Sequence, residues 1–356
     1  MTIEKRGRSY RVTVYKNGIR HRKTFKTKVE ALQWELAMQT ASTVEDVESR
    51  GKTFGDLLVL YYTDVGRHKK SAVSINSTIN VTLKHPIAST LLENLKTEHI
   101  EKFFKDRQNS LTKRGTPPSL ITLQHFRTVF SVSIGYGLKL KWMKDNPIQR
   151  FKLETPTGHR ERTATDEEIK ILCDFVGWDG ISPPRTYRQQ IIAAFVFSTL
   201  TGMRQGEIIQ LQPDWIQGRF IKLPEGTTKT SRSRNVALSK KALALLNTVL
   251  SLNFNDNVFG LRRLRSRVSV VFHAIREAAG LGPVYDEQGN IIKEGLNFHD
   301  GRATFATWAA SARSNGAPHL DPMTLARQLG HSDVKMTMRY YRSTPEQIAD
   351  MLDMED

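Results

Sequence analysis

The stretch from residue 296 to residue 342 constrains the possible structures of this chain more than any other. It combines a mostly helical pattern with four side chains of the kinds that bind or attack phosphates: His299, Arg302, His331 and Tyr340. Arg302 follows His299 by three residues, so both side chains share one face where a helix begins. His331 follows Gly330, and a glycine can end one helix and turn the chain into the next. The spacing alone fits two interpretations: a phosphate-handling site without a metal, or a helical domain whose histidine and tyrosine side chains are satisfied in its core.

Five short motifs follow one another in the carboxyl-terminal half of the chain. They are TGMRQGE at 201–207, TKT at 228–230, HDGR at 299–302, LGH at 329–331 and RYY at 339–341. In this order and at these intervals, the motifs resemble the catalytic signature of the tyrosine recombinases, the lambda-type phage integrase family. A His-x-x-Arg motif alone would not be specific, whereas the ordered set is. The resemblance implies a site-specific DNA recombinase of the phage integrase type, which integrates or excises a mobile element.

The resemblance implies six catalytic residues: Arg204, Lys229, His299, Arg302, His331 and Tyr340. The arginines would grip the non-bridging oxygens of a DNA phosphate, because a guanidinium stays charged and can bind two oxygens at once. The first histidine would act as a base or as a hydrogen-bond partner of the phosphate. The second would be a further hydrogen-bond donor to the phosphate. Lys229 would protonate the departing 5′ oxygen after Tyr340 attacks and forms a 3′-phosphotyrosine. Since the phosphotyrosine bond conserves the energy of the phosphodiester bond that is broken, no metal or other cofactor is expected.

Other features of these motifs leave alternatives open. Glu207, three residues after Arg204, would orient that arginine or be only a helix charge. Tyr341 directly follows the predicted nucleophile, but the family presents its tyrosine after an arginine, which selects Tyr340. Should the hairpin that carries the lysine have a different register, three nearby basic residues are substitutes for it: Lys222, Arg232 and Arg234.

The charge of the chain predicts a polyanionic partner. Lysine and arginine number 53 against 36 acidic residues, which gives a net charge of +17 at pH 7 and a pI near 9.9. Such an excess attracts nucleic acid and releases counterions on binding, so double-stranded DNA, in particular an attachment site, is the expected partner.

No basic amphipathic helix supports an anionic membrane as partner, and no apolar run approaches the ~18–20 residues that span a bilayer. The N-terminus lacks a secretory signal and the single Cys173 suits a reducing compartment, which predicts a cytoplasmic protein. The resemblance implies that the compartment is the cytoplasm of a bacterial host, with the protein associated with its nucleoid.

The hydrophobic periodicity predicts a multidomain, mainly α-helical protein with small β elements. We expect an arm-type DNA-binding module (a three-stranded sheet and a helix) at 1–45, a helical core-binding domain at 46–150, a linker at 151–164, a mixed but mostly helical catalytic domain at 165–342 and a tail helix at 343–356. Within the catalytic domain, a hairpin is expected around 220–238 and helix from there to the end. Basic residues expected to contact DNA lie in the module, the linker and the hairpin: Arg8, Arg11, Arg20, Arg22, Lys23, Arg160, Arg232 and Arg234.

The resemblance also implies an assembly and leaves other functions open. It implies a homotetramer on DNA, in which the tail packs on a neighbouring protomer, with a host DNA-bending protein and an excisionase as candidate further partners. One alternative is a family member used for inversion or resolution, against which the basic N-terminal module counts. A type IB topoisomerase shares the chemistry but usually lacks the second histidine. From a different class, a non-catalytic DNA-binding remnant remains an alternative.

Overall fold

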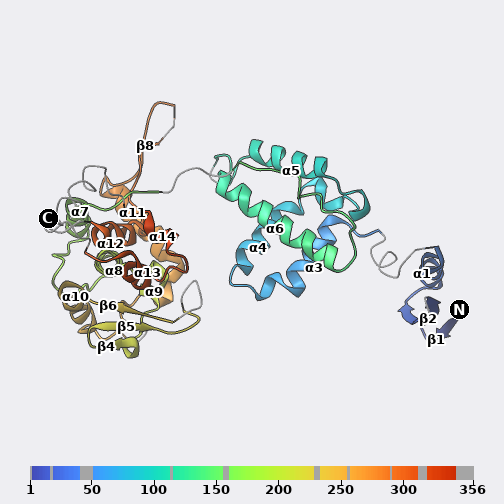
Figure 1. Ribbon diagram of the computed structural model, residues 1–356, viewed down its shortest axis with the longest axis horizontal. Coiled ribbons are helices and arrows are strands. Elements are labelled where there is room, and N and C mark those ends of the chain that lie inside the picture. The colour runs from blue at the N-terminus through green and yellow to red at the C-terminus, as the bar shows by residue number, and fades with distance from the viewer. Residues whose placement is uncertain are drawn as a thin grey trace, which may run out of the picture. The chain divides into compact units, whose positions relative to one another are not determined.

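The predicted fold class, mainly helical with small β elements, is confirmed. A computed structural model describes residues 2–16, 19–40, 51–112, 115–154, 160–227, 233–254, 257–288, 291–311 and 319–341. The chain forms two compact units, Met1–Gly158 and His159–Asp356. Helices dominate both units, and the strands are short (Figure 1). Among the described residues, no helix is long and apolar enough to cross a membrane.

The N-terminal module is a three-stranded sheet with one helix. Its elements are β1 (Thr2–Arg6), β2 (Ser9–Lys16), β3 (Ile19–Phe25) and α1 (Lys28–Thr40), and the antiparallel strands follow in the order β1-β2-β3. Val12 and Val14 of β2 alternate toward one face of the sheet, where they pack with Ala31 of the helix. Lys16 pairs with Ile19, as expected for a hairpin with a two-residue loop. Residues 17 and 18 themselves lie outside the described residues.

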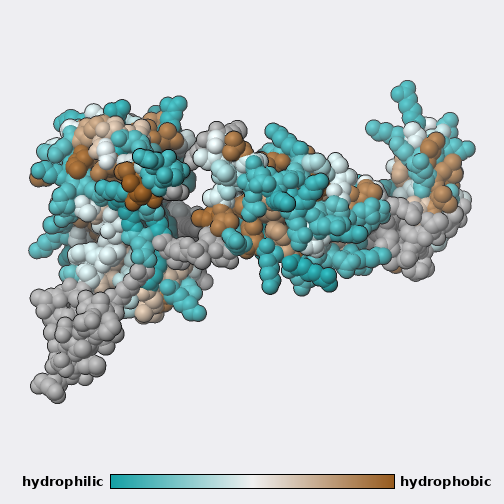
Figure 2. Space-filling view, turned by 90° about the horizontal axis from the view of Figure 1, so that it is seen from above, coloured by the Kyte–Doolittle hydropathy of each residue, from teal (hydrophilic) through white to brown (hydrophobic). Residues whose placement is uncertain are grey.

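The helical domain that follows has an aromatic core. Its helices are α3 (Phe54–Asp64), α4 (Ala72–Thr82), α5 (Thr97–Asn109) and α6 (Leu120–Lys139). Thr53 caps α3 by accepting a hydrogen bond at 3.1 Å from the backbone nitrogen of the third helical residue. Phe103 and Phe104 of α5 meet Phe130 of α6 with ring centroids 4.9 and 5.8 Å apart. Hydrophilic residues cover most of the visible face of this domain (Figure 2), so its apolar side chains are concentrated in the interior.

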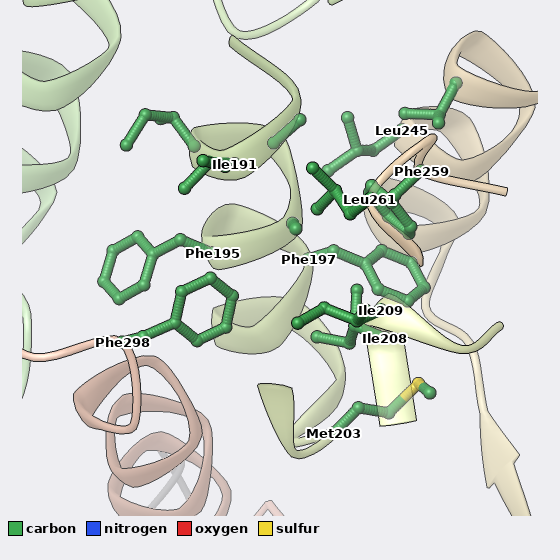
Figure 3. Close-up of a cluster of buried hydrophobic side chains, with 14 of the residues drawn as sticks. Ile191, Phe195, Phe197, Met203, Ile208, Ile209, Leu245, Phe259, Leu261 and Phe298 are labelled. Atoms are coloured by element: carbon green, nitrogen blue, oxygen red, sulfur yellow. The ribbon is translucent and has the colours of Figure 1, made fainter. Parts of the chain in front are cut away.

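The second unit is built around one buried helix, α8. Its elements are α7 (Asp166–Phe175), α8 (Tyr187–Thr201), α9 (Gln205–Ile209), β4 (Ile216–Gln217), β5 (Phe220–Leu223), β6 (Arg234–Ala237), α10 (Lys240–Leu250), α11 (Arg265–Ala278), β7 (Val284–Tyr285), β8 (Ile291–Lys293), α12 (Asp300–Ala310), α13 (Pro322–Leu329) and α14 (Lys335–Met338). From α8, Phe195 points toward Phe298 and Phe197 toward Phe259, with centroids 5.7 and 5.4 Å apart (Figure 3). The strands β4, β5 and β6 form one antiparallel sheet, which includes the expected hairpin.

The expectation of continuous helix after residue 238 is wrong. Strands β7 and β8 pair as an antiparallel hairpin instead. Their side chains are exposed, with Val284 at 44% and Ile292 at 66%, so no buried face gives them an alternating pattern. The dipeptide Gly289-Asn290, which lies between Val284-Tyr285 and Ile291-Ile292, is the sequence feature that would have indicated this hairpin. Those two residues lie outside the described ranges.

The expected linker at 151–164 is anchored at both ends. Phe151 is buried in the core of the helical domain. Arg162 forms a bidentate ion pair with Glu168 of α7, at 2.7 and 3.0 Å, and Arg160 pairs with Asp300 of α12 at 2.7 and 2.8 Å. Both ends of the expected linker therefore belong to folded units.

Two glycines end the helices that lead into the expected site. Gly202 closes α8 with φ +69°, and Gly330 closes α13 with φ +67°. A Cβ on Gly202 would lie 2.6 Å from side-chain atoms of Leu329 and Phe305, and one on Gly330 would lie 2.6 Å from Cδ of Arg234. Both positions therefore require glycine, for the backbone conformation and for space.

Replacing Gly202 by alanine is expected to destabilise the second unit by roughly 2–4 kcal/mol, about 1 kcal/mol from the left-handed backbone and the remainder from overpacking. Gly177→Ala is the matched control, because Gly177 has φ +65° but no atom within 4 Å of an added Cβ. Calorimetric unfolding should show a larger fall in Tm for Gly202→Ala than for Gly177→Ala. Equal falls would mean that the neighbours of Gly202 relax without cost.

Candidate active site

Arg302 is held inside the second unit by the ends of two helices. It lies in the first turn of α12 and is 3% exposed. Its terminal nitrogens donate to the carbonyl oxygens of Gly202 at 2.6 Å and Leu329 at 2.7 Å, where the dipoles of α8 and α13 are negative. Burial, followed by repulsion from Arg204, lowers the pKa of Arg302 to about 9. The guanidinium therefore remains charged at neutral pH.

A single carboxylate, Glu207, binds two further arginines. Glu207 belongs to α9 and is 3% exposed. It binds Arg234 of β6 in a bidentate pair at 2.7 and 2.8 Å, and it accepts from the side chain of Arg204 at 3.1 Å and from its backbone nitrogen at 2.9 Å. Burial alone would raise the pKa of Glu207, but the hydrogen bonds and charge of Arg234, with the contribution of Arg204, outweigh it and lower the pKa. Glu207 is thus ionised and fixes the orientation of both guanidinium groups.

Gln328 connects the segments that carry these arginines. Its side-chain nitrogen donates to the carbonyls of Thr201 at 3.0 Å and Ala237 at 3.1 Å, and its side-chain oxygen accepts from the Ala237 nitrogen at 2.9 Å. Its own carbonyl accepts from Nε of Arg234 at 3.3 Å. This role of Gln328 is not visible in the sequence, because it exists only once α13, β6 and the end of α8 have come together.

Both predicted histidines lie beside these arginines and are neutral at pH 7. His299 directly precedes α12, and partial desolvation followed by repulsion from Arg302 lowers the pKa of His299. His331 directly follows the glycine that ends α13, and burial followed by repulsion from Arg302 and Arg204 lowers the pKa of His331 to about 3. Nδ1 of His331 lies 2.7 Å from Oγ1 of Thr337 in α14, so this ring has a fixed partner on the segment that carries the tyrosines.

The two adjacent tyrosines have different environments. The Tyr340 hydroxyl oxygen accepts a hydrogen bond from Arg339 at 2.9 Å, and the Arg339 guanidinium lies 4.9 Å from the Tyr340 ring centroid. Tyr341 donates its hydroxyl to the carbonyl of Leu320, and burial together with the charge of Asp321 raises the pKa of Tyr341 to about 12. Tyr341 is therefore a neutral phenol that packs inside the unit. Tyr340 instead lies beside the guanidinium groups of Arg339 and Arg302.

Five of the six predicted catalytic residues come together in the second unit. The charges of Arg204 and Tyr340 both act on the pKa of Arg302, and those of Arg204, Arg302 and Arg339 act on the pKa of both histidines. The sixth residue, Lys229, and its substitute Arg232 lie outside the described residues. No group of three or more His, Cys, Asp or Glu side chains that could hold a metal ion occurs in the described part of the chain. Two further residues of the site, Arg339 and Thr337, are not among the residues predicted from the sequence.

The residues predicted to contact DNA fall into two groups. Arg8, Arg20, Arg22 and Lys23 are exposed on the N-terminal module, and Arg11 there is partly buried. Two others are engaged with carboxylates inside the second unit, Arg160 with Asp300 and Arg234 with Glu207. The side chain of Arg234 is 9% exposed, so this arginine supports Glu207 inside the unit, and a DNA contact at this position stays a prediction.

The sequence is similar to several recombinases over most of its length. It is 25% identical over 347 residues to a putative integrase/recombinase of Haemophilus influenzae, covering 96% of this chain and 86% of that protein. It is equally 25% identical to the integrase of Escherichia phage 186, covering 95% of this chain and 92% of that one. A shufflon-specific DNA recombinase of Escherichia coli is 25% identical over 301 residues, which cover 82% of this chain and 70% of that protein.

The fold agrees with these similarities. A lambda integrase dimer bound to a COC′ core site matches with a TM-score of 0.63 at 15% identity, over 96% of this chain and 94% of that chain. A lambda integrase tetramer bound to a Holliday junction matches with a TM-score of 0.62 at 15% identity, over 96% of each chain. The model of the phage integrase family matches residues 165–347, just over half of the chain and all of the site described above. The chain therefore belongs to the phage integrase family and is a tyrosine recombinase.

Proposed function

We propose that this recombinase is a phage-type integrase, which cleaves and rejoins DNA through a 3′-phosphotyrosine and thereby inserts or excises a mobile element. The observation that carries the proposal is the convergence of both histidines with Arg204 and Arg302, and of the Tyr340 phenol with Arg302. Within the described residues of this cluster, Glu207 is the carboxylate that compensates the arginines. A DNA phosphate would supply further negative charge where the guanidinium groups converge.

In the proposed first step, the Tyr340 oxygen attacks a phosphate and the bond from phosphorus to the 5′ oxygen breaks. Arg204 and Arg302 hold the non-bridging oxygens, on which negative charge grows. His299 suits the role of proton acceptor for the phenol, because its lowered pKa keeps the imidazole neutral. Lys229 would protonate the departing 5′ oxygen. In the second step, a 5′-hydroxyl of a partner duplex attacks the phosphotyrosine and releases the phenol, without a metal or nucleotide.

The N-terminal module is proposed to bind accessory arm-type sites. Its exposed cations lie on a small sheet, and the guanidinium of Arg20 lies 5.8 Å from the Tyr15 ring centroid. A basic sheet of this kind can bind the phosphate backbone and enter a groove of the duplex. The helical domain would bind the core site, and the active assembly would be a homotetramer on two duplexes, as the tetrameric state of the lambda structure suggests. A host DNA-bending protein and an excisionase are proposed accessory partners in a bacterial cytoplasm.

Inversion is the alternative function, favoured by the similarity to the shufflon-specific recombinase. The two functions differ in the arrangement of sites that supports strand exchange. An integrase should join sites on separate molecules, whereas an invertase should act mainly on inverted sites within one molecule. Footprinting on DNA that flanks the gene would first identify the sites. Recombination would then be measured between two inverted sites on one molecule and between two sites on separate molecules, and the arrangement that supports strand exchange would discriminate the two functions.

Tyr340→Phe is expected to abolish the covalent protein–DNA adduct, because the attacking oxygen is removed. Tyr341→Phe is the matched variant, since it deletes the neighbouring hydroxyl and leaves the nucleophile in place. It should retain the adduct within a few-fold and should cost about 1 kcal/mol of stability through the lost bond to Leu320. Trapping on a nicked substrate, followed by denaturing electrophoresis, measures the adduct.

Persistence of the adduct in Tyr340→Phe, or its loss in Tyr341→Phe, would contradict the assignment of the nucleophile. If the unaltered protein binds the footprinted site but never forms an adduct under these conditions, a non-catalytic DNA-binding protein becomes the better description. These three outcomes are distinct, so one set of reactions discriminates between them.

Glu207→Gln is expected to lower adduct formation by more than tenfold and stability by roughly 3–5 kcal/mol, because it leaves buried cations without their counter-charge. The lowered pKa of Glu207 means that its charge stabilises the fold above the unfolded-state value of about 4.3, and that this contribution is lost as the pH falls through the folded-state pKa. The difference in stability between the variant and the unaltered protein should therefore shrink below about pH 4.

Glu168→Gln is the matched control for that variant. Glu168 forms an equally bidentate pair with Arg162, and both side chains are 13% exposed. This control should lose stability in urea denaturation but keep the rate of adduct formation. Equal adduct rates in the two variants would show that Glu207 acts only through stability and not through the orientation of the arginines.

A further inference from the structure

Thr337 is completely buried in α14, three residues before Tyr340. Its hydroxyl oxygen lies 2.7 Å from Nδ1 of His331. Threonine in a helix often donates to the carbonyl four residues back, and Thr82 in the helical domain does so, with Thr78 at 2.9 Å. For Thr337, the contact with the imidazole is the only hydrogen bond of the hydroxyl to any described residue.

This single contact determines which atom donates. A threonine hydroxyl carries one hydrogen, and a buried donor without an acceptor costs roughly 1–3 kcal/mol. If Nδ1 of His331 carried the proton, it would donate to the oxygen of Thr337 and leave the hydroxyl hydrogen without an acceptor. If instead the hydroxyl donates to Nδ1, the hydrogen is satisfied and the imidazole proton is on Nε2.

We propose that Thr337 is a positioning residue that holds His331 in the neutral tautomer with its proton on Nε2. The ring then presents a fixed N–H donor to a non-bridging oxygen of the DNA phosphate. The use of that donor rests on the proposed function, whereas the tautomer is a property of the protein without DNA. Tyr340 lies just beyond the end of α14, and its backbone nitrogen donates to the carbonyl of Thr337 at 3.0 Å. The contact of Thr337 with His331 therefore also fixes the segment of the proposed nucleophile relative to the imidazole that donates to the phosphate.

The charges around His331 are consistent with a neutral ring. Arginines from four segments face it: Arg302 from α12, Arg204 before α9, Arg339 after α14 and Arg234 from β6. A protonated ring would be repelled by all four and would donate from both nitrogens. A neutral ring that donates from Nε2 can bind a phosphate oxygen alongside these arginines without adding a further charge to balance.

Nitrogen-15 NMR of the histidine-labelled full-length chain tests the tautomer directly. The two-bond couplings distinguish a protonated from an unprotonated ring nitrogen, and a His331→Gln variant identifies the resonance. We expect Nδ1 to be unprotonated in the unaltered protein and in Thr337→Ser, which keeps the hydroxyl. In Thr337→Val, of nearly equal shape, the two nitrogens should show averaged shifts because no hydroxyl selects a tautomer.

Adduct formation on a nicked substrate tests the function of the donor. Thr337→Val should be slower by about two- to tenfold, because the tautomer mixture lowers the fraction of rings that carry the Nε2 donor and the ring also loses its fixed orientation, while Thr337→Ser should keep the rate of the unaltered protein. Thr82→Val is the matched control, because it removes an equally buried helical hydroxyl in the other unit. It should leave both the His331 resonances and the adduct rate unchanged.

Each result bears on a different part of the inference. A proton on Nδ1 in the unaltered protein, or an unmixed Nε2 tautomer in Thr337→Val, overturns the positioning role. A mixed tautomer with an unchanged adduct rate overturns the link between the donor and the phosphate. If the unaltered protein forms no adduct at all, the proposed function fails, while the NMR result still decides whether Thr337 sets the tautomer.

Discussion

The site depends on how several like charges are kept together in a partly buried space. Two unit charges 4 Å apart interact by about 4 kcal/mol at an effective dielectric constant near 20, so the repulsion among the arginines is large on the scale of protein stability. Glu207 compensates Arg204 and Arg234, whereas Arg302 is bound by two backbone carbonyls. The lowered pKa of Arg302 indicates that this compensation is incomplete. An entering phosphate would relieve the remaining repulsion, so the same imbalance that limits stability favours binding of the substrate.

The carbonyls that hold Arg302 explain why two of the motifs contain glycine. Gly202 and Gly330 both adopt left-handed conformations that end a helix, and a helix end leaves carbonyl groups without partners in the helix. The arginines use these groups: Arg302 binds the carbonyls of Gly202 and Leu329, and Arg204 approaches those of Leu329 and Gly330 at 3.4 and 3.3 Å. The glycine of each motif therefore ends a helix and leaves backbone carbonyls free to accept hydrogen bonds from an arginine that lies elsewhere in the sequence.

Features that depend on local sequence could be predicted, and those that depend on contacts between distant segments could not. The amino-terminal hairpin, the buried α8 and the helix ends at the glycines follow from alternation, composition and turn residues. The ion pair of Arg234 with Glu207 could not be predicted, because a basic residue in a hairpin carries no sign of its partner and Glu207 lies 27 positions away. Gln328 and Thr337 were missed for the same reason. The exposed β7–β8 hairpin was missed because it lacks the alternation that a buried face imposes.

The position of Tyr340, the proposed nucleophile, is determined by contacts on either side of it. Helix α14 has only four residues, too few to be stable by itself. Thr337 is held by His331 before the phenol, and Tyr341 is held by the Leu320 carbonyl after it. Tyr340 also packs against the small apolar cluster of α12 and α13. If Tyr340 attacks phosphorus as proposed, a short segment fixed at both ends would hold its oxygen in place at little entropic cost on binding, which is the condition that a direct attack requires.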